Sequence, residues 1–146
     1  MRNLNKRTKK DAFAIPRIEE TLNHLAGLKY FSKLDLKAGY WQVEIEESDK
    51  EKTAFQVGGG LGFFECNRMP FGCCNAPATF QRLMERCMGD LNLKDCLIYL
   101  DDIIIFSNDV DSHIQKLDLV FQRLLKCTLK IKPSKCKLFK ENIVYL

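Results

Sequence analysis

A chain of 146 residues with 46% hydrophobic residues can bury one core, which favours a single domain or part of one. The N-terminus has no apolar signal region and no apolar stretch approaches the roughly 18 residues of a membrane span, so a soluble protein with no membrane partner is expected. Seven cysteines scattered through apolar segments are typical of reduced core thiols, and neither a disulfide scaffold nor a zinc site is expected.

The net charge of +4 conceals a segregation of charge along the chain. Residues 1–10 carry five basic groups and residues 119–140 carry seven, in both cases without an acid, whereas residues 11–118 carry 18 acids and 11 bases. Basic segments on either side of an acidic centre suit a polyanion held across a cation-binding site. An ordinary solvated surface explains the same pattern equally well.

The first half of the chain predicts one helix and several strands. Apolar residues recur at helical spacing over residues 15–25, after a proline that suits the first turn and before Gly27. Residues 29–36 and 41–45 read as strands joined by a bend. Residues 53–67 read as a hairpin around three consecutive glycines.

The second half predicts two amphipathic helices on either side of a hairpin. Apolar side chains at helical spacing predict a helix between Asn75 and Gly89 and another over residues 114–125. Between them, two apolar runs surround Asp101-Asp102, which a two-residue turn explains. Two last short strands are predicted at residues 136–139 and 143–146. This order predicts an α+β domain, with an antiparallel sheet covered by helices on one face.

The predicted hairpin carries two adjacent carboxylates in an apolar setting. No Lys or Arg occurs between Cys96 and Phe106, so nothing nearby in the sequence neutralises Asp101 and Asp102. Adjacent like charges destabilise a fold, and carboxylates in apolar surroundings tend to take up protons unless a cation compensates them. Two aspartates in a turn that faces water explain the pattern equally well.

Asp35 lies at the end of a predicted strand, where an isolated aspartate is usually a cap. Together with Asp101 and Asp102, it could instead converge on two divalent ions. Sites rich in carboxylate oxygens favour magnesium. Two such ions about 3.5 to 4 Å apart can activate a hydroxyl and stabilise the departing oxygen in a phosphoryl displacement.

Five blocks of sequence, in order and over almost the whole chain, resemble the reverse transcriptase of gypsy-like LTR retrotransposons. They are YFSKLDLKAGYWQV, KTAF, MPFG followed by NAPATFQRLM, YLDDIIIFS, and LKIKPSKCKLF. The resemblance implies a polymerase palm-like sheet with part of the fingers, and an RNA- and DNA-templated DNA polymerase. It also implies two Mg²⁺ ions, an RNA or DNA template with a primer, and dNTPs.

The resemblance implies roles for single residues. Asp35, Asp101 and Asp102 correspond to the family's catalytic, metal-binding aspartates. Tyr40 corresponds to the aromatic gate that excludes a 2′-hydroxyl, with a plain core aromatic as the alternative. Lys135 is a possible general acid for the leaving pyrophosphate, with a surface lysine as the alternative. The other implied substrate-binding residues are Leu36, Lys37, Ala38 and Gly39 in a phosphate-binding turn, Phe71 and Gly72 in the nucleotide pocket, and Gln81 near the template strand.

Residues 1–146 match a fingers remnant and the palm, and the thumb, ribonuclease H and integrase regions are expected to be absent, as parts of the remainder of a Pol polyprotein. The isolated fragment is therefore expected to be almost inactive. Its expected location is the cytoplasm, in virus-like particles, with the nucleus as a possible second location. One alternative is a domesticated or decaying remnant that binds nucleic acid without catalysis. Another is a palm-type RNA-dependent RNA polymerase, against which Tyr40 argues.

Overall fold

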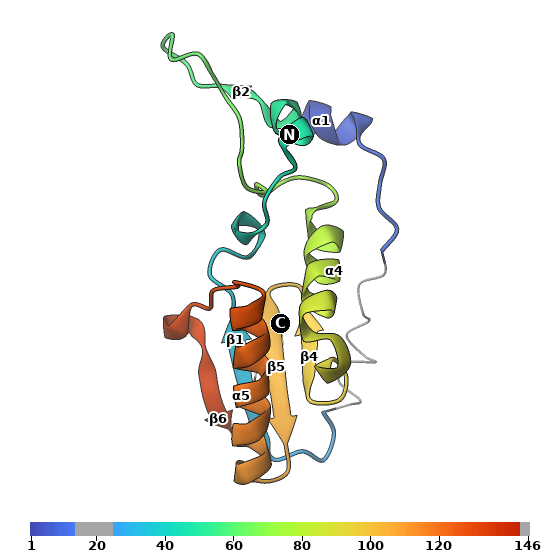
Figure 1. Ribbon diagram of the computed structural model, residues 1–146, viewed down its shortest axis with the longest axis vertical. Coiled ribbons are helices and arrows are strands. Elements are labelled where there is room, and N and C mark those ends of the chain that lie inside the picture. Colours follow the sequence, from blue (N-terminus) through green and yellow to red (C-terminus); the bar gives the residue numbers. More distant parts are fainter. Residues whose placement is uncertain (14–24, 144–146) are drawn as a thin grey trace.

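The computed structural model describes residues 1–13 and 25–143. Its helices and strands are joined by several short 3₁₀ turns (Figure 1). In chain order the elements are α1 (Arg2–Arg7), β1 (Tyr30–Asp35), η1 (Gly39–Gln42), α3 (Glu47–Lys50), η2 (Glu51–Thr53), β2 (Phe55–Gln56), β3 (Phe63–Phe64), α4 (Ala76–Met88), η3 (Gly89–Leu91), β4 (Cys96–Tyr99), β5 (Asp102–Ser107), α5 (Val110–Lys126), η4 (Pro133–Lys135) and β6 (Lys137–Lys140).

The main sheet has the strand order β4-β5-β1-β6, and each neighbouring pair is antiparallel. β1 therefore lies inside the sheet, although both of its partners come from the far half of the chain. α4 and α5 cover the same face of this sheet, and the separate β2–β3 hairpin extends away from it at the end nearest α1 (Figure 1). An antiparallel sheet with helices on one face confirms the predicted α+β class.

The main core lies between this sheet face and the two helices. Leu34, Ile103 and Ile105 are fully buried there, together with Phe80 and Met84 of α4. Burial of each such side chain contributes roughly 1.5 to 3 kcal/mol. The alternate strand positions form a smaller cluster on the other face, which contains Phe31, Leu97, Ile104 and Phe106. Both faces of β5 are thus buried, as expected for its continuous apolar run.

α4 confirms the helix predicted between Asn75 and Gly89. Asn75 is its N-cap, a proline lies in its first turn, and Gly89 ends it with a positive φ of 54°. Phe80 and Met84 on its apolar stripe are fully buried. Local apolar spacing and the residues at the two ends therefore specify this helix.

α5 confirms the second predicted helix, but its apolar residues divide between two faces. Leu117, Val120 and Leu124 are buried against the sheet, whereas Ile114 and Leu125 are 53% and 80% exposed. Helical spacing alone does not decide which of two adjacent apolar stripes faces the sheet. Part of the predicted apolar set therefore faces away from the sheet.

Residues 41–45, which the structure describes in full, do not form the predicted strand. Ala38 adopts a left-handed conformation with a φ of 53°, and the chain after it closes into η1, in which the Trp41 N–H donates to the Ala38 carbonyl. Only the end of the segment is extended, where Glu44 forms an isolated bridge with Arg68. A tight turn therefore overrides the strand propensity of this segment.

The remaining predictions differ in their outcome. The predicted helix over residues 15–25 lies outside the described residues except at its last position, as do residues 144–146 of the last predicted strand. β6 confirms a strand close to residues 136–139, and the glycine-rich hairpin is confirmed with shorter strands than predicted. α1 was not predicted. No helix in the described ranges is long and apolar enough to cross a membrane.

His113 of α5 is fully buried and connects this helix to three strands of the sheet. Its Nε2 lies 2.7 Å from the Ser32 hydroxyl on β1, and its Nδ1 lies 2.9 Å from the Ser107 hydroxyl on β5. Ser32 also accepts the Phe139 N–H of β6, and Ser107 donates to the Asp109 carbonyl. Because Ser107 donates elsewhere, it accepts from the ring, so a neutral His113 protonated at Nδ1 satisfies every bond.

Acid is expected to destabilise the fold through His113. Burial, with a further contribution from Lys116, holds the pKa of His113 below its ordinary value of 6.5. The unfolded chain therefore takes up this proton at a higher pH, so the stabilisation is present above about pH 6.5 and is lost as the pH falls through the lowered pKa. Urea titrations on both sides of this range should show a lower unfolding midpoint in acid for the wild type. The same decrease in His113→Gln would assign the effect to other groups.

Candidate active site

The β4–β5 hairpin places its two aspartates in different environments. Tyr99 pairs with Asp102 in the ladder, so the turn consists of Leu100 and Asp101, and Asp102 is the first residue of β5. The two-residue turn predicted around both aspartates is thus shifted by one position. Leu100 has a φ of 54°, which is unfavourable for a residue with a side chain, so the turn needs support from its surroundings.

Gln81 of α4 provides this support. Its side chain is fully buried, and its Oε1 accepts the Leu100 N–H at 2.9 Å. Its Nε2 donates to the Glu85 carboxylate at 3.0 Å and to the Ile98 carbonyl at 3.4 Å. These bonds occupy the buried amide, so Gln81 holds the hairpin. Its nearness to a template strand stays a prediction.

Three carboxylates from distant parts of the sequence gather at this end of the sheet. Asp35 ends β1 directly opposite Asp102, and the Leu36 N–H donates to the Asp101 carbonyl at 3.2 Å. Partial burial raises the pKa of Asp101, and the charges of Asp102 and Asp35 raise it further, against lowering contributions from its own backbone and Lys135. Asp35 and Asp102 therefore both lie close enough to act electrostatically on Asp101.

Two lysines compensate part of this negative charge. The Lys33 ammonium lies 2.6 Å from Asp102 Oδ2, and the Lys135 ammonium lies 3.7 Å from Asp35 Oδ2. No basic residue near the hairpin in the sequence neutralises its carboxylates, and the compensating charge at Asp102 comes from Lys33 on another strand. Sequence reasoning missed Lys33, although its position two residues before Asp35 on the same strand places both side chains on one face.

The chemistry of the three carboxylates suits magnesium, which prefers oxygen ligands. As the side chains lie, no group of three or more His, Cys, Asp and Glu residues within the described ranges is arranged to hold a metal ion. Lys33 and Lys135 supply positive charge at two of the carboxylates instead. A bound cation would therefore compete with both ammonium groups.

The turn that follows β1 runs against the hairpin. A Cβ at Gly39 would lie 3.2 Å from the Asp101 Cβ, so this approach depends on glycine. The Leu36 N–H donates to the Asp101 carbonyl, and the Lys37 N–H donates to the Lys130 carbonyl. These two donors are used within the protein, so their contact with a triphosphate, which stays a prediction, would replace one of these hydrogen bonds. Ala38 and Gly39 remain candidates for that role.

An aromatic cluster lies beside the carboxylates. The Tyr40 ring centroid is 5.2 Å from that of Phe71 and 5.4 Å from that of Phe80. Burial, together with the nearby charge of Asp101, raises the pKa of the Tyr40 hydroxyl, so this group stays neutral at physiological pH. Phe71 is 61% exposed and is followed by Gly72. Tyr40 and Phe71 thus present an apolar surface next to Asp101.

The chain is similar in sequence to reverse transcriptases over its whole length. The family model for reverse transcriptase (RNA-dependent DNA polymerase) matches residues 1–146. The retrovirus-related Pol polyproteins of the Drosophila melanogaster transposons 297 and gypsy are 43% and 39% identical to it over 99% of this chain, which spans 14% of their length. The enzymatic polyprotein of Cauliflower mosaic virus (strain NY8153) is 35% identical over 98% of this chain and 21% of its own length.

The fold is similar to that of solved reverse transcriptases. A foamy viral protease-reverse transcriptase in complex with double-stranded DNA has a TM-score of 0.90 and 26% identity, over 99% of this chain and 25% of that chain. Another, in complex with an RNA/DNA hybrid, has a TM-score of 0.86 and 26% identity, over 99% of this chain and 19% of that chain. These similarities confirm the predicted palm-like sheet with part of the fingers. Because the family model covers every residue, the chain belongs to the reverse transcriptase family.

Proposed function

We propose that this chain is the core of an RNA- and DNA-templated DNA polymerase, in which Asp35, Asp101 and Asp102 hold two magnesium ions. The observation that carries this proposal is the gathering of these carboxylates at one end of the sheet, beside the aromatic surface at Tyr40. When bound, the ions would lower the barrier to attack of the primer 3′-hydroxyl on the α-phosphate of a dNTP and stabilise the leaving pyrophosphate.

The other residues of the site bind and orient the nucleotide. The Tyr40 ring lies under the sugar and excludes a 2′-hydroxyl, and the backbone N–H groups of Ala38 and Gly39 donate to the triphosphate. Phe71 and Gly72 line the pocket around the new base pair. Lys135, whose ammonium already lies near Asp35, donates a proton to the leaving pyrophosphate.

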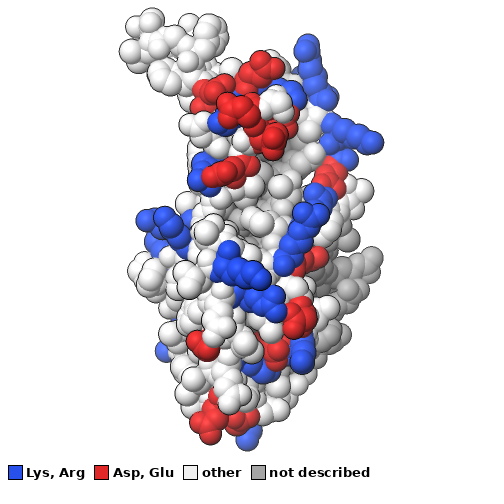
Figure 2. Space-filling view, in the orientation of Figure 1, with Lys and Arg blue, Asp and Glu red and all other residues white. Residues whose placement is uncertain are grey.

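The proposed macromolecular ligand is a primer on an RNA or DNA template. Lys and Arg side chains are spread over the middle of the face in Figure 2, whereas acidic side chains gather over α3 and η2. Since the chain spans 14% of the transposon polyproteins it resembles, we propose that it works with the remainder of a Pol polyprotein. Virus-like particles in the cytoplasm are the proposed location, with the nucleus as a possible second one.

Replacing Asp101 by Asn is expected to reduce magnesium-dependent primer extension about a hundredfold or more, because a charged group at the reacting centre is lost. The test uses the full-length enzyme, meaning residues 1–146 joined to the remaining polymerase segments of the proposed polyprotein. Thermal unfolding should show no loss of stability, since the substitution removes repulsion from Asp102 and Asp35. Asp118→Asn, on the exposed side of α5, is the matched control. Near-normal activity of Asp101→Asn would disprove the metal assignment.

Tyr40→Val in the same enzyme is expected to admit ribonucleotides more readily, because the ring that meets the 2′-hydroxyl is gone. Discrimination is a ratio of kcat/KM values for dNTP and rNTP, and loss of one steric contact changes such ratios by about tenfold or more. Tyr40→Phe keeps the ring and should keep the ratio. An unchanged ratio in Tyr40→Val would leave Tyr40 as a plain core aromatic.

Residues 1–146 by themselves are expected to bind nucleic acid weakly and to extend primers poorly. Well-oriented reactants gain about 7 to 11 kcal/mol over free encounter, and we propose that surfaces outside these residues align the primer. The measurement is a titration of a labelled RNA/DNA hybrid at two salt concentrations, followed by a dNTP incorporation assay with magnesium. Robust incorporation would contradict the expectation. Binding that ignores salt would contradict a role for the basic side chains.

A further inference from the structure

Residues 5–13, here called the N-terminal strap, are bound to the turn before α4 by the side chain of Asn5. The Asn5 amide donates to the Gly72 carbonyl at 2.7 Å, and its oxygen accepts the Cys74 N–H at 3.0 Å. One side-chain amide therefore satisfies a backbone acceptor and a backbone donor of the same turn, as a neighbouring strand would.

Asn75 makes the reciprocal contact from the other side. Its Nδ2 donates to the Lys9 carbonyl at 2.8 Å, and its Oδ1 accepts the Asp11 N–H at 3.0 Å. Asn75 is also the N-cap of α4, yet its side chain makes no capping hydrogen bond with the helix. Capping is the usual reason for asparagine at this position. The Asn75 side chain therefore forms its hydrogen bonds with the strap and not with the first turn of the helix.

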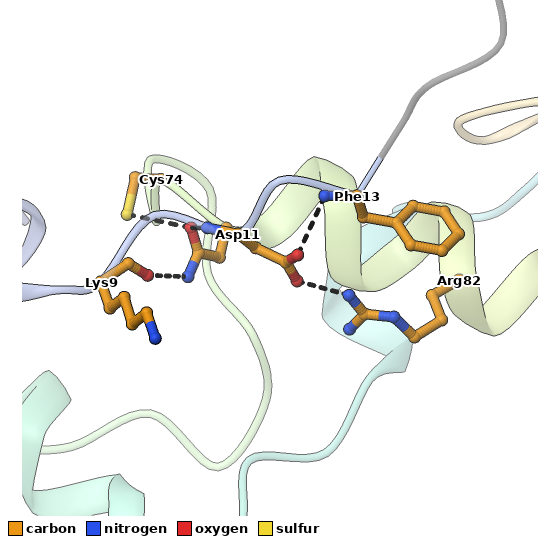
Figure 3. A network of polar contacts seen from close by, with 6 residues as sticks. Lys9, Asp11, Phe13, Cys74 and Arg82 are labelled. Atoms are coloured by element: carbon orange, nitrogen blue, oxygen red, sulfur yellow. Dashed lines mark hydrogen bonds and ion pairs between the residues drawn. The ribbon is translucent and has the colours of Figure 1, made fainter.

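A charged contact fixes the far end of the strap (Figure 3). The Arg82 guanidinium lies 2.5 Å from Asp11 Oδ2 and 4.8 Å from the Phe13 ring centroid. The other carboxylate oxygen of Asp11 accepts the Phe13 N–H at 3.0 Å. The hydrogen bond from Arg82 holds the pKa of Asp11 below its ordinary value, so this carboxylate is ionised at neutral pH. The strap is therefore held at one end to the turn before α4 and at the other end to α4 itself.

The turn that Asn5 holds carries the exposed half of the aromatic surface. Phe71 lies directly before Gly72, contacts the Tyr40 ring and is 61% exposed. Gly72 has a φ of 92°, a conformation in which glycine is free to move and other residues are strained. The two hydrogen bonds that the Asn5 side chain makes, one donated to Gly72 and one accepted from Cys74, restrict the backbone on both sides of Cys73 and so limit where Phe71 can lie.

We propose that Asn5 is a positioning residue for the nucleotide pocket, because its amide fixes the turn that holds Phe71 against Tyr40. This inference rests on the proposed function, in which the dNTP binds beside Tyr40 and Phe71. Asn5 itself touches neither the nucleotide nor the reacting atoms. Its effect is therefore on the affinity for dNTP and not on the chemical step.

The test compares Asn5→Leu, Asn5→Asp and Asn3→Leu in the full-length enzyme. Asn5→Leu should weaken dNTP binding in single-nucleotide incorporation about tenfold, the size expected for the loss of two neutral hydrogen bonds, with the maximal rate unchanged. Asn5→Asp keeps the acceptor for the Cys74 N–H and should have a smaller effect. Asn3, exposed on the same helix, is the matched control. Hydrogen exchange of the peptide that contains residues 72–75 should rise only in the Asn5 variants.

The outcomes separate this inference from the proposed function. Faster exchange in Asn5→Leu with unchanged dNTP affinity would overturn the inference and leave the polymerase assignment intact. Equal losses of rate and affinity in both Asn5 variants, together with a lower unfolding temperature, would overturn it in favour of a general structural role. A wild-type enzyme that extends no primer would overturn both proposals, whatever the exchange shows.

Discussion

Antiparallel pairing of β1 with β5 determines where the chemistry of this protein can take place. The register that sets Asp35 opposite Asp102 also places Lys33 on the same face of the sheet and Leu34 on the other. Since successive side chains of a strand alternate between faces, a slip of one residue would turn the carboxylates towards the helices. Burial of Leu34 and Ile103 in the main core fixes the register, and thereby the site.

The site combines repulsion with compensation. The charges of Asp35 and Asp102 act unfavourably on the Asp101 carboxylate, and the ammonium groups of Lys33 and Lys135 offset part of the negative charge of the site. The Lys33 pair is mostly shielded from water, so salt screens it less than an exposed pair. Behind the turn, the buried amide of Gln81 satisfies the Leu100 N–H in a strained conformation. The scaffold thus carries a charged turn that would be unstable in isolation.

Apolar spacing in the sequence was sufficient to predict α4, α5, β1 and the hairpin, because each is specified by residues close to one another. Prediction failed where distant contacts decide. Residues 41–45 have the composition of a strand. The left-handed conformation of Ala38 and two hydrogen bonds between the Gln42 side chain and the Lys130 backbone instead favour the 3₁₀ turn η1 at the start of this segment. The sequence motif was sufficient to single out the three aspartates. The ion pair of Lys33 with Asp102 and the burial of Gln81 could not be predicted, because they depend on neighbours across the sheet and the hairpin.

The strand order has a consequence for folding kinetics. β4 and β5 are joined by a short turn and can pair early, whereas β1 must close long loops to reach both β5 and β6. Closing such loops costs entropy before the contacts compensate for it, so insertion of β1 is expected to be late and slow. Lys33 enters on the same strand as Asp35. Asp35 therefore joins the two hairpin aspartates at the same step as Lys33, the counter-charge of Asp102, whereas the early hairpin carries Asp101 and Asp102 without this ion pair.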